Sequence, residues 1–94
     1  MSIKNIEGTT SFGMMYFVCN AELHLSSHHG LFICWPVDDV HISKVKNPDD
    51  YGVTWSLCSN DRSTSLKAIL TEDEALLFAD ALGCEIKIIE RPAG

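Results

Sequence analysis

Three histidines and a cysteine lie within one short stretch of the chain and have side chains that bind metals. They are His24, His28, His29 and Cys34. Imidazole nitrogens and thiolates are preferred zinc ligands, and a structural zinc site needs four of them converging tetrahedrally. The spacing lacks the closely paired cysteines of a zinc finger. We therefore expect a polar hairpin tip with exposed histidines here, and a Cys/His zinc-binding module is the weakest of three hypotheses.

A second group combines acidic and aromatic side chains in the middle of the chain. It comprises Trp35, Asp38, Asp39, Asp49, Asp50 and Tyr51. Neither aspartate pair has the alternating oxygen ligands of a calcium loop, so no cation site is expected. Tryptophan and tyrosine anchor many protein interfaces, and acidic neighbours direct such a surface toward a basic partner. This group is the predicted partner-binding site, although a tryptophan on a strand is often part of the core.

The overall charge favours the same kind of partner. The 94 residues include 13 acidic and 7 basic side chains, which gives a formal net charge of −6. Nucleic-acid backbones are bound by clustered lysine and arginine, so direct binding of DNA or RNA is not expected. An acidic surface accelerates encounter with a basic one.

No catalytic motif accompanies these groups. The sequence has no Gly-x-Ser-x-Gly, no His-Glu-x-x-His and no phosphate-binding glycine loop. A domain with one helix rarely encloses the ~300 Å³ that a small-molecule site needs. We therefore expect no enzyme activity and no cofactor.

One helix is predicted over residues 72–82. Thr71 and Glu74 form a capping box, and Gly83 provides a C-terminal stop. An apolar stripe recurs at helical spacing, with two further leucines that widen it: Ala75, Phe78, Ala79 and Leu82, then Leu76 and Leu77. A strand over 85–90 follows, and we expect it to lie beneath the helix rather than at a bare edge.

The remaining segments alternate between short strands and turns. We predict a single α+β domain over residues 1–94, with an antiparallel twisted sheet of about five or six strands and the helix across one face. Residues 7–10 are expected to form a turn. Residues 31–35 are apolar on both faces, which is typical of a central strand or one covered by the helix.

The compartment is predicted to be the cytoplasm. The first residues show no apolar run or cleavage site of a signal peptide. The longest apolar run, residues 14–19, is far too short to span a membrane, so no membrane partner is expected. Four cysteines without a Cys-x-x-Cys pair are typical of small core side chains in a reducing compartment.

These observations favour a small non-enzymatic protein-binding module. Immunity proteins, antitoxins and phage-encoded anti-defence inhibitors are similar in size and charge, which is an analogy of class. Such an inhibitor would occlude a basic surface of its partner, for example one that binds nucleic acid. The alternative is a self-associating structural protein, a homodimer that pairs through an exposed edge strand such as 40–45 or 65–70.

Overall fold

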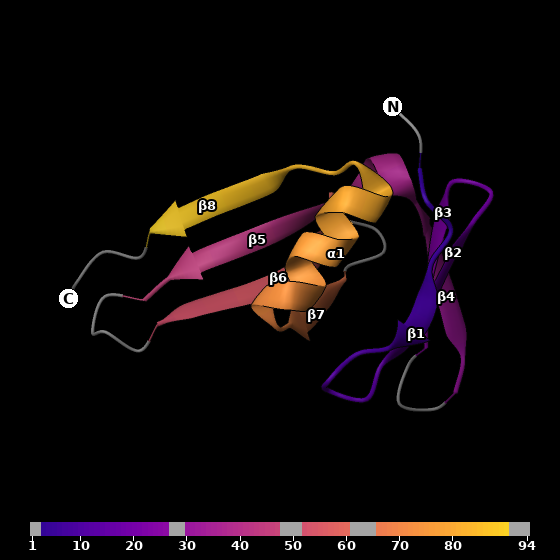
Figure 1. The fold of residues 1–94 in the computed structure, drawn as a ribbon, viewed down its shortest axis with the longest axis horizontal. Coiled ribbons are helices and arrows are strands. Elements are labelled where there is room, and N and C mark those ends of the chain that lie inside the picture. The colour runs from indigo at the N-terminus through magenta and orange to yellow at the C-terminus, as the bar shows by residue number, and fades with distance from the viewer. Residues whose placement is uncertain (1–2, 27–29, 48–51, 61–65, 91–94) are drawn as a thin grey trace.

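The computed structural model describes residues 3–26, 30–47, 52–60 and 66–90. Within these ranges the chain forms two four-stranded β-sheets, one α-helix and one 3₁₀ turn (Figure 1). The α+β class, the helix and the C-terminal strand expected from the sequence are confirmed.

The N-terminal sheet is an antiparallel meander of consecutive strands. Its strands are β1 (Glu7–Thr9), β2 (Met15–Cys19), β3 (Glu22–Ser26) and β4 (Phe32–Pro36), in the order β1-β2-β3-β4. Alternate side chains of β2 and β3 face the core, which buries Tyr16, Val18, Leu23 and Leu25.

The C-terminal sheet begins after the 3₁₀ turn η1 (Val37–Asp39). Its strands are β5 (Val40–Lys46), β6 (Val53–Ser59), β7 (Lys67–Leu70) and β8 (Ile86–Glu90), in the order β7-β6-β5-β8. β5, β6 and β7 pair antiparallel, whereas β8 runs parallel to β5. A parallel partner requires a crossover, and the helix α1 (Glu72–Leu82) provides it.

Both ends of α1 have the caps that the sequence predicts. The Thr71 hydroxyl accepts a hydrogen bond from the Glu74 N–H at 3.2 Å, and the Glu74 carboxylate accepts from the Thr71 N–H at 2.9 Å. Gly83 ends the helix in the left-handed region, at φ 65°, which glycine adopts at little cost. The second Glu74 oxygen accepts from the Ser11 N–H at 2.8 Å, so the same carboxylate ties the helix start to the loop between β1 and β2.

Replacing Thr71 by alanine should lower the free energy of unfolding by about 1 kcal/mol, because the Glu74 N–H loses its acceptor. Urea denaturation of the two proteins measures the difference. A Thr71→Ser variant keeps the hydroxyl and should stay close to the parent. Equal stability of the alanine variant and the parent would contradict the capping role.

One core joins the two sheets and the helix. Buried side chains come from β2, β3, β4, β5, β6, β7 and α1, and form a single cluster. The Phe78 ring of α1 contacts the Tyr16 ring of β2 edge to face, with centroids 4.7 Å apart. Figure 1 shows α1 across one face of the C-terminal sheet, with the N-terminal sheet beside it. In the same view, the ends of β5, β6 and β8 extend past the helix (Figure 1).

Two sheets replace the single sheet of five or six strands expected from the sequence. The division falls at η1, which carries the chain from β4 into β5 without a hairpin. Pro36 ends β4, since proline cannot donate to a strand ladder. The sequence shows this break, but not that the chain then starts a separate sheet.

Three local expectations were wrong. Residues 7–9 form the edge strand β1 rather than a turn. β4 is an edge strand with Phe32 and Ile33 exposed, although its apolar character suggested a central position. β8 is also an edge strand, next to β5, whereas we expected it to be protected.

Candidate functional site

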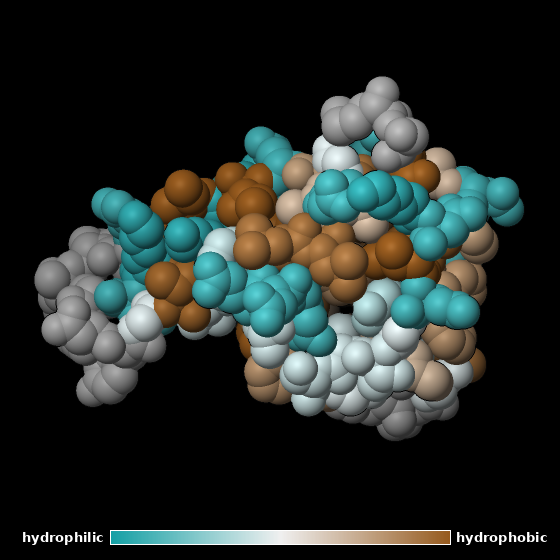
Figure 2. Space-filling model, in the orientation of Figure 1, coloured by the Kyte–Doolittle hydropathy of each residue, from teal (hydrophilic) through white to brown (hydrophobic). Residues whose placement is uncertain are grey.

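The outer face of α1 combines apolar and acidic side chains. We call Asp73, Leu76, Leu77 and Asp80 the α1 outer stripe. Leu76 is 48 % exposed and Leu77 is 42 % exposed, and both aspartates are exposed. Positions 73, 76, 77 and 80 recur at helical spacing, so these four side chains share one face. Figure 2 shows apolar surface over α1 with hydrophilic surface beside it.

The helix that carries the stripe has a net negative charge. The helix contains Glu72, Asp73, Glu74 and Asp80 and no basic residue. Lys4 forms an exposed ion pair with Asp80 at 2.7 Å, and no other ion pair involves α1 in the described part of the chain. The four carboxylates therefore outnumber the one lysine that the structure places against the helix.

The exposure of Leu76 and Leu77 corrects the sequence expectation that they widen the buried stripe. The packed face of the helix is centred on Ala75, Phe78 and Leu82. At about 100° per residue, Leu76 and Leu77 lie on the two shoulders of the opposite face. The C-terminal sheet covers one side of α1 and the N-terminal sheet reaches its flank through Tyr16, so the outer shoulders face solvent.

The predicted acidic site is only partly visible. Asp38 is exposed and Asp39 is half-buried, both in η1, and no ion pair of either is present among the described residues. The Asp39 carbonyl accepts a hydrogen bond from the Asn60 N–H at 2.6 Å, which joins η1 to the end of β6. Asp49, Asp50 and Tyr51 lie outside the described residues.

The side chain of Trp35 is buried rather than on the protein surface. Its side chain is 4 % exposed and packs in the core on the inner face of β4, opposite Leu23. The prediction that Trp35 anchors a partner is therefore wrong in this conformation. Alternation along β4 explains this, because Phe32 and Cys34 point to the outer face, whereas Trp35 lies on the face shared with the buried Leu23 and Leu25.

Two of the candidate metal ligands, His24 and Cys34, lie on the outer face of the N-terminal sheet. His24 of β3 is paired with Cys34 of β4, and its Nε2 lies 3.9 Å from the Cys19 sulfur of β2. The His24 ring stacks on Phe17, with centroids 4.3 Å apart. His28 and His29 lie outside the described residues.

The described members of this set, His24 and Cys34, do not form a metal site with their neighbours. No group of three or more potential ligands that could hold a metal is present among the described residues. The Cys34 thiol donates to the Glu22 carboxylate at 3.6 Å. Desolvation, and then the charge and hydrogen bond of Glu22, raise the pKa of Cys34. A raised pKa keeps the thiol protonated, which opposes metal binding.

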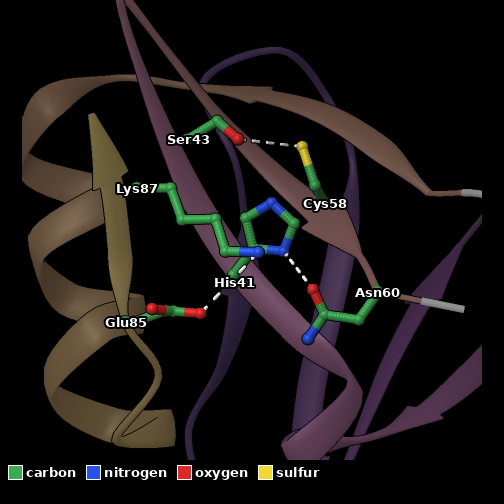
Figure 3. Close-up of polar contacts among 6 residues, drawn as sticks. All are labelled: His41, Ser43, Cys58, Asn60, Glu85 and Lys87. Carbon is green, nitrogen blue, oxygen red and sulfur yellow. Dashed lines mark hydrogen bonds and ion pairs between the residues drawn. The ribbon is translucent and has the colours of Figure 1, made fainter. Parts of the chain in front are cut away.

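A polar group on the other face of the C-terminal sheet has the residue types of a thiol enzyme (Figure 3). His41 is the cross-strand partner of Cys58, and His41 Nδ1 donates to Asn60 Oδ1 at 2.6 Å. The Cys58 sulfur, however, contacts the hydroxyl of Ser43 at 3.5 Å and that of Ser56 at 3.7 Å. No hydrogen bond joins it to His41 in the structure.

This arrangement lacks the activation step of a catalytic thiol. Such a thiol loses its proton to an imidazole within hydrogen-bonding reach. The Glu85–Lys87 ion pair on the same face, at 3.7 Å, is exposed and joins two residues that are close in the chain. The geometry therefore gives a polar sheet surface and supplies no support for a nucleophilic mechanism.

A cleft of about 540 Å³ lies between the two sheets, at the free edge of β7. Its described lining comprises Thr10, Phe12, Gly13, Met14, Met15, Ser26, Gly30, Lys67, Ala68 and Ile69. This volume corrects the expectation that so small a domain leaves no room for a small-molecule site. Lys67 is the one titratable side chain in that lining, so no acid–base pair faces the cleft from the described residues.

Comparisons with known proteins give no relative: no family model, no curated protein and no solved structure matches this chain. No helix within the described ranges is long and apolar enough to cross a membrane.

The α1 outer stripe is the candidate site that the structure supports best, because it combines exposed apolar and acidic side chains on one helix face. Sequence reasoning missed it because the leucines were assigned to the core, although the spacing of Asp73 and Asp80 around them was visible.

Proposed function

We propose that this chain is a non-enzymatic protein-binding module that occludes a basic surface of its partner. The α1 outer stripe is the observation that carries the proposal. Two exposed leucines offer apolar contact area, and aspartates at both ends of the stripe favour a partner with lysine or arginine around an apolar centre. Asp38 of η1 is also exposed and adds to the acidic surface of the chain.

Two physical effects support an inhibitory role of the immunity, antitoxin or anti-defence kind. Complementary charge accelerates encounter, and buried apolar contacts then slow dissociation. A partner surface that binds nucleic acid is rich in lysine and arginine, so covering it with carboxylates competes directly with phosphate. The helix is capped at both ends and packs on the core through its buried face, which keeps the ordering cost of binding small.

The test compares three baits in affinity capture from the native cell. The first is the parent chain. The second carries Leu76→Gln and Leu77→Gln, which keep helix propensity while removing apolar area. The third is a matched control, Leu31→Gln, because Leu31 is 69 % exposed and lies outside the helix.

We expect to capture a basic protein. The parent chain and the Leu31→Gln control should retain it, and the variant with Leu76→Gln and Leu77→Gln should lose it. With that protein purified, the stripe variant should bind at least about tenfold more weakly, as expected for a central apolar contact. Asp73→Asn with Asp80→Asn should slow association and flatten its decrease with added salt. Retention of the captured proteins by the stripe variant, or capture of no protein by the parent, would refute the proposal.

A further inference from the structure

The edge strand β8 presents an unprotected row of backbone groups. It is the last strand of the C-terminal sheet, in the order β7-β6-β5-β8, and no described strand lies beyond it. Its side chains are exposed on both faces, with Ile88 at 61 % and Ile89 at 44 %. Figure 1 shows β8 at the margin of the sheet, and Figure 2 shows apolar surface along it. Exposed apolar edge strands are templates for pairing with another strand.

The hydrogen bonds to β5 determine which backbone groups of β8 are free. The Ile42 N–H donates to the Glu85 carbonyl at 2.9 Å, and Ile42 is level with Ile86. In a parallel ladder alternate residues direct both backbone groups to the same neighbour. Residues 85, 87 and 89 therefore point toward β5, and residues 86, 88 and 90 point their N–H and C=O away from the sheet.

The charges on β8 do not protect this edge. Charged side chains, lysine above all, are one of several devices against edge pairing. Here Lys87 pairs with Glu85 at 3.7 Å, and Glu90 pairs with Lys46 of β5 at 3.6 Å. The charges of Lys87 and Glu90 are thus each neutralised by a residue of the same chain. Ile88 lies between these two residues at the centre of the strand.

We propose that two copies of this chain pair through β8, antiparallel, about a two-fold axis at Ile88. This register places Ile88 opposite Ile88 of the second copy, and Ile86 opposite Glu90. The residues in these pairs all have outward-pointing backbone groups, so each pair exchanges both N–H···O bonds. The two C-terminal sheets become one continuous sheet, closed by the symmetry.

Neighbouring registers are less favourable. Centring the axis on Lys87 places two lysines directly opposite each other, which is destabilising in an antiparallel pair. Centring it on Ile89 pairs only residues 88 and 90 with each other and leaves Ile86 without a partner in the described strand. The register at Ile88 avoids the lysine pair, uses all three outward-pointing residues, and places two isoleucines together, which suits a β-sheet surface.

The axis is perpendicular to the sheet, so both α1 helices lie on the same side of the dimer. Two α1 outer stripes would then face a partner together. The inference does not depend on the proposed function, because β8 and the α1 outer stripe are separate surfaces. The dependence on salt distinguishes self-association from binding to a basic partner. Each copy carries a net charge of −6, so added salt should strengthen self-association by screening repulsion. The same screening weakens binding to a basic partner.

The experiment measures mass by light scattering during size exclusion, at low and high salt. The parent at high micromolar concentration should show the mass of two chains, more completely at high salt. Ile88→Pro removes the outward N–H, which edge positions tolerate, and should give the mass of one chain. Ile88→Lys places two positive charges on the axis and should do the same with every backbone bond to β5 kept. The control Ile88→Val should remain dimeric.

Hydrogen exchange gives a second readout on the unmodified chain. The Ile88 amide should exchange slowly in concentrated protein and rapidly after dilution, whereas the Lys87 amide, which points toward β5, should change little. Three results would overturn the proposal: a parent with the mass of one chain at both salt concentrations, a dimer that persists in Ile88→Lys, or an Ile88 amide insensitive to dilution. If Ile88→Pro does not fold, Ile88→Lys and the exchange rates still decide.

Discussion

Phe78→Ala is expected to lower the free energy of unfolding by about 3–5 kcal/mol, because the ring leaves a cavity that its neighbours cannot fill. Phe78 is fully buried and lies where α1 meets both sheets. Its ring also contacts Tyr16 at an interplanar angle of 62°, an edge-to-face geometry that adds to the area buried. Small domains have about 5–15 kcal/mol of total stability, so this loss would leave a substantial unfolded fraction.

Urea denaturation followed by circular dichroism measures this effect. Leu76→Ala is the matched control, since it truncates an apolar side chain of the same helix on the exposed face. The control should change stability by about 0.5 kcal/mol or less. Equal losses for the two variants would contradict the orientation of the helix.

Leu23→Ala should have the second largest effect, a loss of about 2–5 kcal/mol. Leu23 is on β3, is fully buried, and is paired with the buried Trp35. The N-terminal sheet meets the rest of the molecule through this inner face, so the variant tests whether that sheet shares one core with α1 and the C-terminal sheet.

The next residue along the strand provides the comparison. His24 points to the outer face and stacks on Phe17, so His24→Ala should cost at most about 1.5 kcal/mol. Thermal unfolding of Leu23→Ala should remain a single transition at lower temperature. Two separate transitions, or a larger loss for His24→Ala, would refute the shared core.

Local features of the fold could be predicted from the sequence because their causes are local. Thr71, Glu74 and Gly83 determine where α1 begins and ends, since capping depends on residues within one turn. The alternation of Val53, Trp55 and Leu57 places these residues on one face of β6, where Trp55 and Leu57 are buried.

Strand order could not be predicted in the same way. β4 is apolar on both faces yet lies at an edge, and β5 is central although residues 40–45 were considered an edge candidate. Strand composition reports how much apolar surface a segment carries, whereas pairing depends on contacts between segments far apart in the chain.

The candidate site shows the same division. The sequence determined that the chain is acidic, that it has one capped helix, and that it lacks the spacing of a zinc finger or a catalytic motif. Packing between distant segments placed Trp35 in the core and left Leu76 and Leu77 exposed. The physical reason is that an apolar residue becomes core or surface according to which neighbours cover it. In this fold, the packing of two sheets against α1, rather than one, determines which apolar side chains are covered.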